Sequence, residues 1–129
     1  MTGARLALVA VLVPDYDAGI AFFTGALGFQ LVEDTDLGGG KRWVRVAPPG
    51  GGSEVLVARA ATDAQRAAIG GHGGGRVCLF LETDDFARDH AAFCAAGVVF
   101  EEAPRAEPYG TVAVFRDPFG NRWDLIERA

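Results

Sequence analysis

The 129-residue sequence contains few cysteines and few histidines, two of each. Cys78 and Cys94 lie within apolar runs and not in turns, which favours reduced, buried thiols over a disulfide. No secretory leader precedes the first strand-like segment, so the pattern predicts a cytoplasmic protein. His72 lies in a glycine stretch and His90 in the middle of an expected helix, and we interpret both as loop or surface residues.

Long apolar runs and clusters of basic residues are scarce as well. The longest apolar run, Leu6–Val13, is far shorter than the ~20 residues that span a bilayer, so we expect no membrane-spanning segment. The formal net charge of -5 disfavours binding to nucleic acid, because that binding depends on clustered lysine and arginine. Lys41, Arg42 and Arg45 form the one basic cluster, and a solvated strand face explains them more simply. We therefore expect neither a membrane nor a nucleic-acid partner.

An apolar content of 50% is sufficient for one domain with its own core. In the first half, the run at Leu6–Val13 is dense enough for a strand buried on both faces, and Pro14 ends it. A helix follows, with Asp15 or Asp17 as its N-cap and Gly28 as the residue that ends it. Turns rich in glycine and proline then separate three expected strands, at residues 29–34, 42–47 and 54–59.

The second half repeats this order of elements. Val77–Leu81 is the expected strand, Thr83 the expected N-cap, and Gly97 the residue that ends the helix. A turn at residues 117–120, DPFG, precedes the last strand. Three strands are expected after the helix, at residues 98–101, 111–116 and 122–127. We therefore predict an α+β fold in which two βαβββ modules, 5–60 and 76–128, pack their sheets together as one domain, 1–129, with a linker at 61–75.

Two motifs carry a resemblance to a known family: FFTGALGF in the first module and DPFGNRWDLIE at the end of the second. With these motifs the chain resembles the vicinal oxygen chelate superfamily, which includes glyoxalase I, extradiol dioxygenases, methylmalonyl-CoA epimerase and the bleomycin and fosfomycin resistance proteins. The resemblance implies mixed sheets that curl into a cup-shaped, barrel-like structure with the helices outside, and a homodimer. In the metal enzymes of the family, two histidines and one or two glutamates inside the cup hold a divalent metal.

The resemblance implies four metal-ligand positions, and none of them holds a histidine in this sequence. Two of them fall at Leu8, which cannot bind a metal, and at Cys78, so both histidine positions are lost. The other two fall at Glu54 and Asp124. We expect no standard metal centre and no cofactor. A divalent metal held by Glu54 and Asp124, together with the Cys78 thiolate, is the alternative.

The remaining polar residues define a candidate binding site. If Asp124 points into the cup, the two-residue period of its strand turns Arg122 the same way and Trp123 toward the helices. Arg122 is then placed either to pair with Asp124 and keep it ionised, or to form a structural ion pair across strands. Tyr109 either reaches the mouth of the cup or closes a turn. The candidate ligand-binding residues are Leu8, Trp43, Cys78, Phe80, Tyr109, Arg122 and Asp124.

A lining of this kind, aromatic and aliphatic with few polar groups, suits a small apolar or aromatic molecule. Nucleophilic catalysis lacks its usual residues, because serine is scarce, G-x-S-x-G is absent and neither cysteine has a histidine at a partner position. We therefore predict a small-molecule-binding protein of the glyoxalase/bleomycin-resistance type, without the standard metal centre and with no assigned catalytic residue. A metal-dependent lyase, isomerase or dioxygenase with an atypical ligand set is the alternative, and a purely structural partner module is the third.

Overall fold

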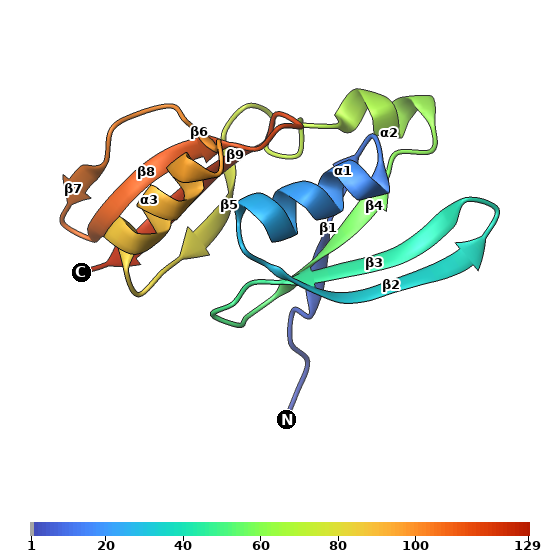
Figure 1. Ribbon diagram of the computed structural model, residues 1–129, viewed down its shortest axis with the longest axis horizontal. Helices are drawn as coiled ribbons and strands as arrows, with labels where there is room; N and C mark the ends of the chain where they lie inside the picture. The colour runs from blue at the N-terminus through green and yellow to red at the C-terminus, as the bar shows by residue number, and fades with distance from the viewer. Residues whose placement is uncertain (1) are drawn as a thin grey trace. The chain divides into compact units, whose positions relative to one another are not determined.

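In the computed structural model, which describes residues 2–129, the chain divides into two units (Figure 1). Unit 1 ends at Arg66, and unit 2 spans Ala67–Ala129. Each unit contains one mixed β-sheet and a helical segment that follows the first strand, which confirms the expected α+β fold of βαβββ modules. Within residues 2–129, no helix combines the length and the apolar character needed to cross a membrane.

Unit 1 is built on a four-stranded sheet in the order β1-β4-β3-β2. β1 and β4 are parallel, and β3 pairs antiparallel with both β4 and β2. β1 begins at Leu8 and not at Leu6, because its pairing with β4 starts opposite Glu54. β2 extends beyond its expected end, because its pairing with β3 continues to Gly38. The elements are β1 (Leu8–Val13), α1 (Tyr16–Ile20), the π-helix η1 (Ala21–Ala26), β2 (Gln30–Gly38), β3 (Lys41–Ala47) and β4 (Glu54–Arg59).

The helical segment of unit 1 begins at Asp15, one of the two expected N-caps. The Asp15 carboxylate accepts hydrogen bonds from two backbone N–H groups of the first turn, at 3.4 and 3.3 Å. The second half of the segment is π-helical, and the N–H of Leu27 donates to the carbonyl of Phe22. The spacing of the apolar residues predicted a helix here, but it did not predict that part of the helix is π-helical. Gly28, with φ of 71°, ends the segment as expected.

Unit 2 is built on a five-stranded sheet in the order β5-β9-β8-β6, with the short strand β7 paired to β8. β7 was not predicted, because its three residues are too few to show a sequence period. The prediction of Thr83 as N-cap was wrong: the Asp85 carboxylate accepts from the N–H of Arg88, and the Thr83 hydroxyl accepts from the N–H of Asp85 outside the helix. The elements are β5 (Val77–Glu82), α3 (Phe86–Ala95), β6 (Val99–Phe100), β7 (Arg105–Glu107), β8 (Gly110–Arg116) and β9 (Arg122–Arg128).

One face of each sheet is covered by the helix of its own unit, and we call the opposite face the helix-free face (Figure 1). In unit 1, Val44 and Val57 lie fully buried on the covered face with Phe23 of η1. Gly19 permits this packing, because a Cβ atom there would lie 2.5 Å from Cγ1 of Val57. In unit 2, Phe93 of α3 contacts Phe115 of β8 with ring centroids 5.8 Å apart. The residues that alternate with these along each strand therefore point to the helix-free face of their sheet.

The segment 61–75, which was expected to link the modules, contains the short helix α2 (Asp63–Ala68) and a glycine stretch that packs against unit 2. Gly70 has φ of 75°, and a Cβ atom added to it would lie 2.1 Å from the carbonyl oxygen of Phe119. A Cβ atom on Gly73 would lie 2.8 Å from Cβ of Cys78. These glycines therefore allow the chain to lie directly on the turn before β9 and on β5.

Candidate functional site

The helix-free face of unit 2 brings Phe80, Asp124 and Val114 into one row across three neighbouring strands. Phe80 of β5 is in register with Asp124 of β9, and Asp124 is in register with Val114 of β8. Residues paired in this way lie side by side on the same face, about 4.5–5.5 Å apart. Trp123 and Leu125, which flank Asp124 in sequence, are buried on the opposite face. The alternation places Asp124 on the helix-free face, next to an aromatic ring that is 60% exposed.

Asp124 is the polar centre of this row. Its Oδ1 atom is buried and has no hydrogen-bond partner. Burial raises the pKa of the Asp124 carboxyl above its ordinary value; nearby Arg105 and Arg122 act in the opposite direction, and Glu102 adds to the increase. A carboxylate in this position is costly for the folded protein, because it loses water without gaining a donor.

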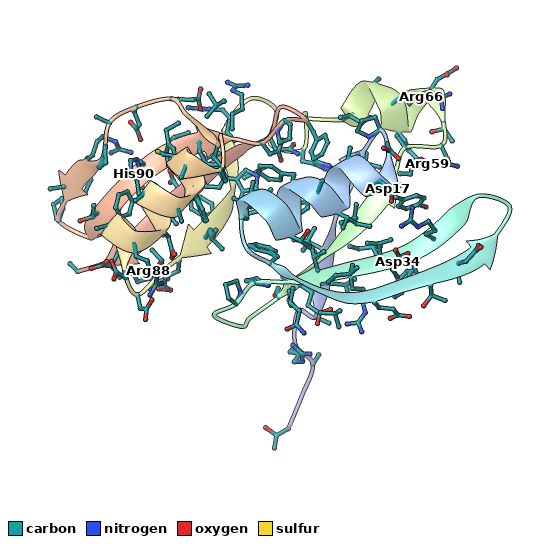
Figure 2. All side chains as sticks on the ribbon, in the orientation of Figure 1. Asp17, Asp34, Arg59, Arg66, Arg88 and His90 are labelled. Atoms are coloured by element: carbon teal, nitrogen blue, oxygen red, sulfur yellow. The ribbon has the colours of Figure 1, made fainter. Side chains whose placement is uncertain are left out.

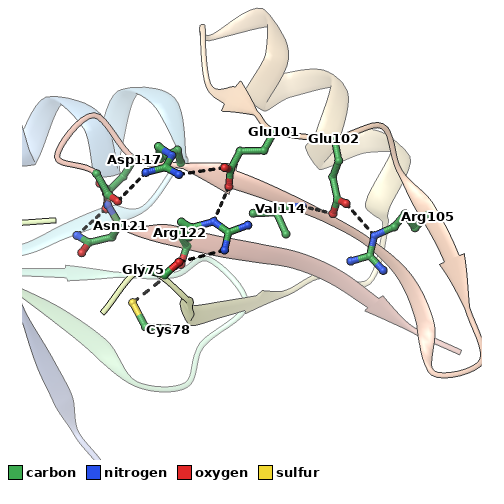
Figure 3. A network of polar contacts seen from close by, with 11 residues as sticks. Gly75, Cys78, Glu101, Glu102, Arg105, Val114, Asp117, Asn121 and Arg122 are labelled. Atoms are coloured by element: carbon green, nitrogen blue, oxygen red, sulfur yellow. Dashed lines mark hydrogen bonds and ion pairs between the residues drawn. The ribbon is translucent and has the colours of Figure 1, made fainter. Parts of the chain in front are cut away.

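Of the two alternatives for Arg122, the structure contains the structural ion pair across strands and not the pair with Asp124. Arg122 donates instead to Glu101, with Nε and Oε2 2.7 Å apart, and to the carbonyl of Gly75 at 3.2 Å (Figure 3). Glu101 also pairs with Arg116 at 3.0 Å. The hydrogen bond from Arg122 is the largest effect that lowers the pKa of Glu101. Glu101 follows β6 and reaches both arginines across the sheet, so the tertiary fold supplies a partner that strand alternation alone did not indicate.

A second arginine, Arg105, is also held by its own acidic partners. It donates to Glu102 at 2.9 Å (Figure 3). It also donates to Glu107 at 2.6 Å. Glu102 in addition accepts the backbone N–H of Val114 at 2.9 Å, which ties it to the strand beside Asp124. Strand alternation did not indicate Glu101, Glu102 or Arg105 as site residues. The sequence feature that could have indicated these residues is the pair of glutamates directly after a short expected strand, followed by a proline and an arginine.

Cys78 lies on β5 near Arg122, and its sulfur is 3.9 Å from the carbonyl oxygen of that residue. Burial, assisted by the charge of Asp117, raises the pKa of the Cys78 thiol, so the thiolate that a metal requires is disfavoured. Both cysteines are free. Cys94 is exposed on α3, so the expectation that both thiols are buried was wrong for this one; its position falls on the outer side of the helix.

In unit 1, Leu8, Glu54 and Trp43 lie on three strands of one sheet. Leu8 of β1 is in register with Glu54 of β4, and Trp43 of β3 is 36% exposed. Arg45, two residues after Trp43 on β3, pairs with Glu54 and with Glu33, the latter at 3.0 Å. Glu54 is therefore already bound to a guanidinium. This face of the unit 1 sheet therefore presents salt-bridged side chains and one aromatic side chain, Trp43.

The donors present do not fit the ligand set that the resemblance implies. Leu8 has no donor atom, Glu54 is paired with Arg45, and Cys78 favours the neutral thiol. Within residues 2–129, no three histidine, cysteine, aspartate or glutamate side chains come together in a group that could hold a metal ion. Asp124 is thus the one implied ligand position whose carboxylate lacks a strong partner.

His90 lies in an aromatic cluster, and Tyr109 lies in a turn. His90 of α3 stacks on Phe86 and contacts Phe100, with ring centroids 5.4 and 4.4 Å apart (Figure 2). It is held in an aromatic cluster, which agrees with a structural role. Tyr109 lies in the turn between β7 and β8, is 54% exposed, and interacts with Arg105. It therefore closes a turn and also contacts the arginine nearest to the site.

Replacing Asp124 with asparagine is expected to stabilise the protein at pH 7 by on the order of 1 kcal/mol. The folded-state pKa of Asp124 is raised above 3.8, so the folded protein binds more protons than the unfolded chain in the window just above that value. This contribution to stability is lost as the pH rises through the window, and it stays lost at pH 7. Urea unfolding from pH 4 to pH 7 measures the difference between the variant and the native protein.

The matched control for this variant is Asp84→Asn, at an exposed aspartate before α3. Its difference from the native protein in the free energy of unfolding should be small, because the side chain is exposed. An Asp124→Asn variant that is less stable than the native protein at pH 7 would contradict the prediction.

Comparison with known proteins gives consistent matches over nearly the whole chain. The family model described as Glyoxalase/Bleomycin resistance protein/Dioxygenase superfamily matches residues 5–125. An uncharacterized protein of Shewanella frigidimarina (strain NCIMB 400) is 48% identical over 121 residues, which cover 92% of this chain and 90% of that protein. The crystal structure of UcmS2 is 30% identical, with a TM-score of 0.83 and coverage of 97% and 98%. TnmS3, an antibiotic binding protein from Streptomyces sp. CB03234, is 29% identical, with a TM-score of 0.79 and coverage of 100% and 99%.

Proposed function

Because this chain belongs to the glyoxalase/bleomycin resistance protein/dioxygenase superfamily, we propose that it binds a small, flat, apolar or aromatic molecule on the helix-free face of unit 2. The observation that carries the proposal is the exposed ring of Phe80 next to the partly buried carboxylate of Asp124. Small-molecule sites combine apolar and aromatic side chains with a small number of placed polar groups, and Phe80 and Asp124 supply one of each kind. Val114, on the other side of Asp124, is a buried apolar neighbour, only 7% exposed.

The similarity to an antibiotic binding protein supports binding as the function. The donor set supports a site without the standard metal centre, because only Asp124 among the four implied positions has a carboxylate free of a strong partner. The metal-dependent alternative has no comparable observation in its favour. The homodimer and the cytoplasmic location expected from the sequence stay predictions.

Binding is tested with N-phenyl-1-naphthylamine, a neutral aromatic dye whose fluorescence increases in apolar surroundings. We expect saturable binding to the native protein and an affinity roughly tenfold weaker in Phe80→Ala, because the ring supplies much of the apolar contact. Phe80 is largely exposed, so the variant should remain folded. The matched control is Leu37→Ala, which removes an exposed apolar side chain at the β2–β3 hairpin and should leave dye binding unchanged.

Two outcomes would overturn the proposal. One is the absence of saturable dye binding, or equal losses in Phe80→Ala and Leu37→Ala. The other is a stoichiometric divalent ion in the purified protein that is lost in Asp124→Ala, which would establish the metal-dependent alternative instead.

A further inference from the structure

The buried Oδ1 atom of Asp124 has no hydrogen-bond partner, and this limits the polar groups that a bound ligand can place there. In residues 2–129, it is one of two buried side-chain oxygens without a hydrogen-bond partner, the other being Oδ1 of Asn121. Asn121 is only 1% exposed and is enclosed in the turn before β9, so no ligand reaches it. Asp124 lies on the helix-free face and keeps part of its side chain exposed. Unpaired buried polar groups are rare in folded proteins, and each requires an explanation.

The two nearest cations do not provide the missing partner. Arg105 is bound to Glu102 and Glu107, and Arg122 is bound to Glu101 and to the carbonyl of Gly75. Both guanidinium groups are therefore already bound to glutamate: Arg105 to two, and Arg122 to Glu101, which it shares with Arg116. The arrangement holds both arginines in place and leaves Oδ1 of Asp124 unpaired, on the strand next to Phe80.

An ionised carboxylate oxygen accepts hydrogen bonds and cannot donate them. A ligand group that only accepts, such as an ether or a carbonyl, would repel this oxygen, whereas an O–H or N–H group would satisfy it. A ligand ring that lies on Phe80 would exclude water around such a contact, which would strengthen it.

We infer that the molecule bound on the helix-free face of unit 2 carries a hydrogen-bond donor, an O–H or N–H group, that pairs with Oδ1 of Asp124 while its apolar ring lies on Phe80. This inference rests on the proposed function, since it specifies the polar chemistry of the same site. Asp124 is then a specificity-determining residue that selects donors over acceptors. Both neutral hydroxyls and protonated amines have the required chemistry.

The test compares three probes with the same ring system: 2-naphthol, 2-(aminomethyl)naphthalene and 2-methoxynaphthalene. The first two donate, the second with a positive charge, and the third only accepts. Calorimetric titration of the native protein at pH 7 should show at least one donor binding roughly tenfold more tightly than 2-methoxynaphthalene. In Asp124→Ala this preference should fall to less than about threefold, with the affinity for 2-methoxynaphthalene unchanged or improved.

Asp84→Ala is the matched control, because it removes an exposed carboxylate of unit 2 outside the helix-free face, and it should keep the native preference. Asp124→Asn separates the two donors: it retains an acceptor oxygen for the hydroxyl but loses the charge that attracts the amine. If the amine is the preferred donor, its advantage should be lost in this variant, and if the hydroxyl is preferred, part of the advantage should remain.

The inference and the proposed function fail in different ways. If all three probes bind equally and Asp124→Ala changes none of them, the donor inference is wrong, while a loss of all three in Phe80→Ala would still support the proposed site. If no probe binds, or Phe80→Ala has no effect on any, the proposed function is wrong and the inference falls with it.

Discussion

Replacing Asp117 with alanine is expected to lower the free energy of unfolding by about 3–5 kcal/mol. Asp117 is 3% exposed and lies in the turn before β9. Its Oδ1 accepts the backbone N–H groups of Phe119 and Asn121 at 3.0 and 2.9 Å, and its Oδ2 accepts Nδ2 of Asn121 and Nε1 of Trp123 at 3.0 and 3.1 Å. Alanine leaves these donors without the carboxylate, and most of them are buried.

The consequences should extend beyond the turn, because Trp123 stacks on Phe115 in the core of unit 2 with ring centroids 5.5 Å apart. Urea unfolding followed by tryptophan fluorescence measures the loss. Asp84→Ala, at an exposed aspartate, should change the free energy of unfolding by no more than about 0.5 kcal/mol. A loss below about 1 kcal/mol for Asp117→Ala would show that the four hydrogen bonds do not stabilise the turn as the geometry indicates.

Replacing Gly70 with alanine is the second large change, with an expected loss of about 3 kcal/mol. Gly70 has φ of 75°, which costs an L-residue on the order of 1 kcal/mol by itself. The added Cβ atom would also lie 2.1 Å from the carbonyl oxygen of Phe119, so the backbone of the glycine stretch or of the turn must move. Because this carbonyl belongs to the turn that Asp117 organises, the two variants should weaken the same region.

Gly74→Ala is the matched control for this variant. Gly74 has φ of 61° but no atom within 4 Å of an added Cβ, so it measures the conformational cost without the steric one. It should lose about 1 kcal/mol in the same unfolding experiment. Equal losses in the two variants would mean that the contact between the glycine stretch and the turn contributes nothing to stability.

Much of the fold was predictable because its signals are local. Apolar runs and the turns that separate them marked β1, β3, β4, β5 and β8 to within one or two residues at each end. Gly28 and Gly97 were correctly predicted to end the helices, since both have positive φ angles that favour glycine. One error occurred where neighbouring residues compete to be the N-cap of a helix, as Thr83 and Asp85 do. Another occurred where a short strand is stabilised mainly by pairing with its neighbour, as β7 is by β8.

The candidate site was predictable in part for the same reason. Strand alternation was enough to place Arg122 and Asp124 together on one face and Trp123 on the other. Alternation could not show which groups pair with Arg122. Its partners, Glu101 and the carbonyl of Gly75, are well separated from it in the sequence. Alternation therefore left the pair with Asp124 and an ion pair across strands as open alternatives, and the fold contains the second, with Glu101.

The sequence by itself determined the α+β order of elements, the family and the position of Asp124 on a strand face, because each depends on periodicity and on motifs read along the chain. Only the tertiary structure decided that Arg105 and Arg122 are bound by other acids and that Oδ1 of Asp124 is left unpaired beside Phe80. The physical reason is that the environment of a charge depends on every group brought near it in space. For Asp124, those groups come from β5, β7, β8 and the segment after β6, which the chain brings together only by folding.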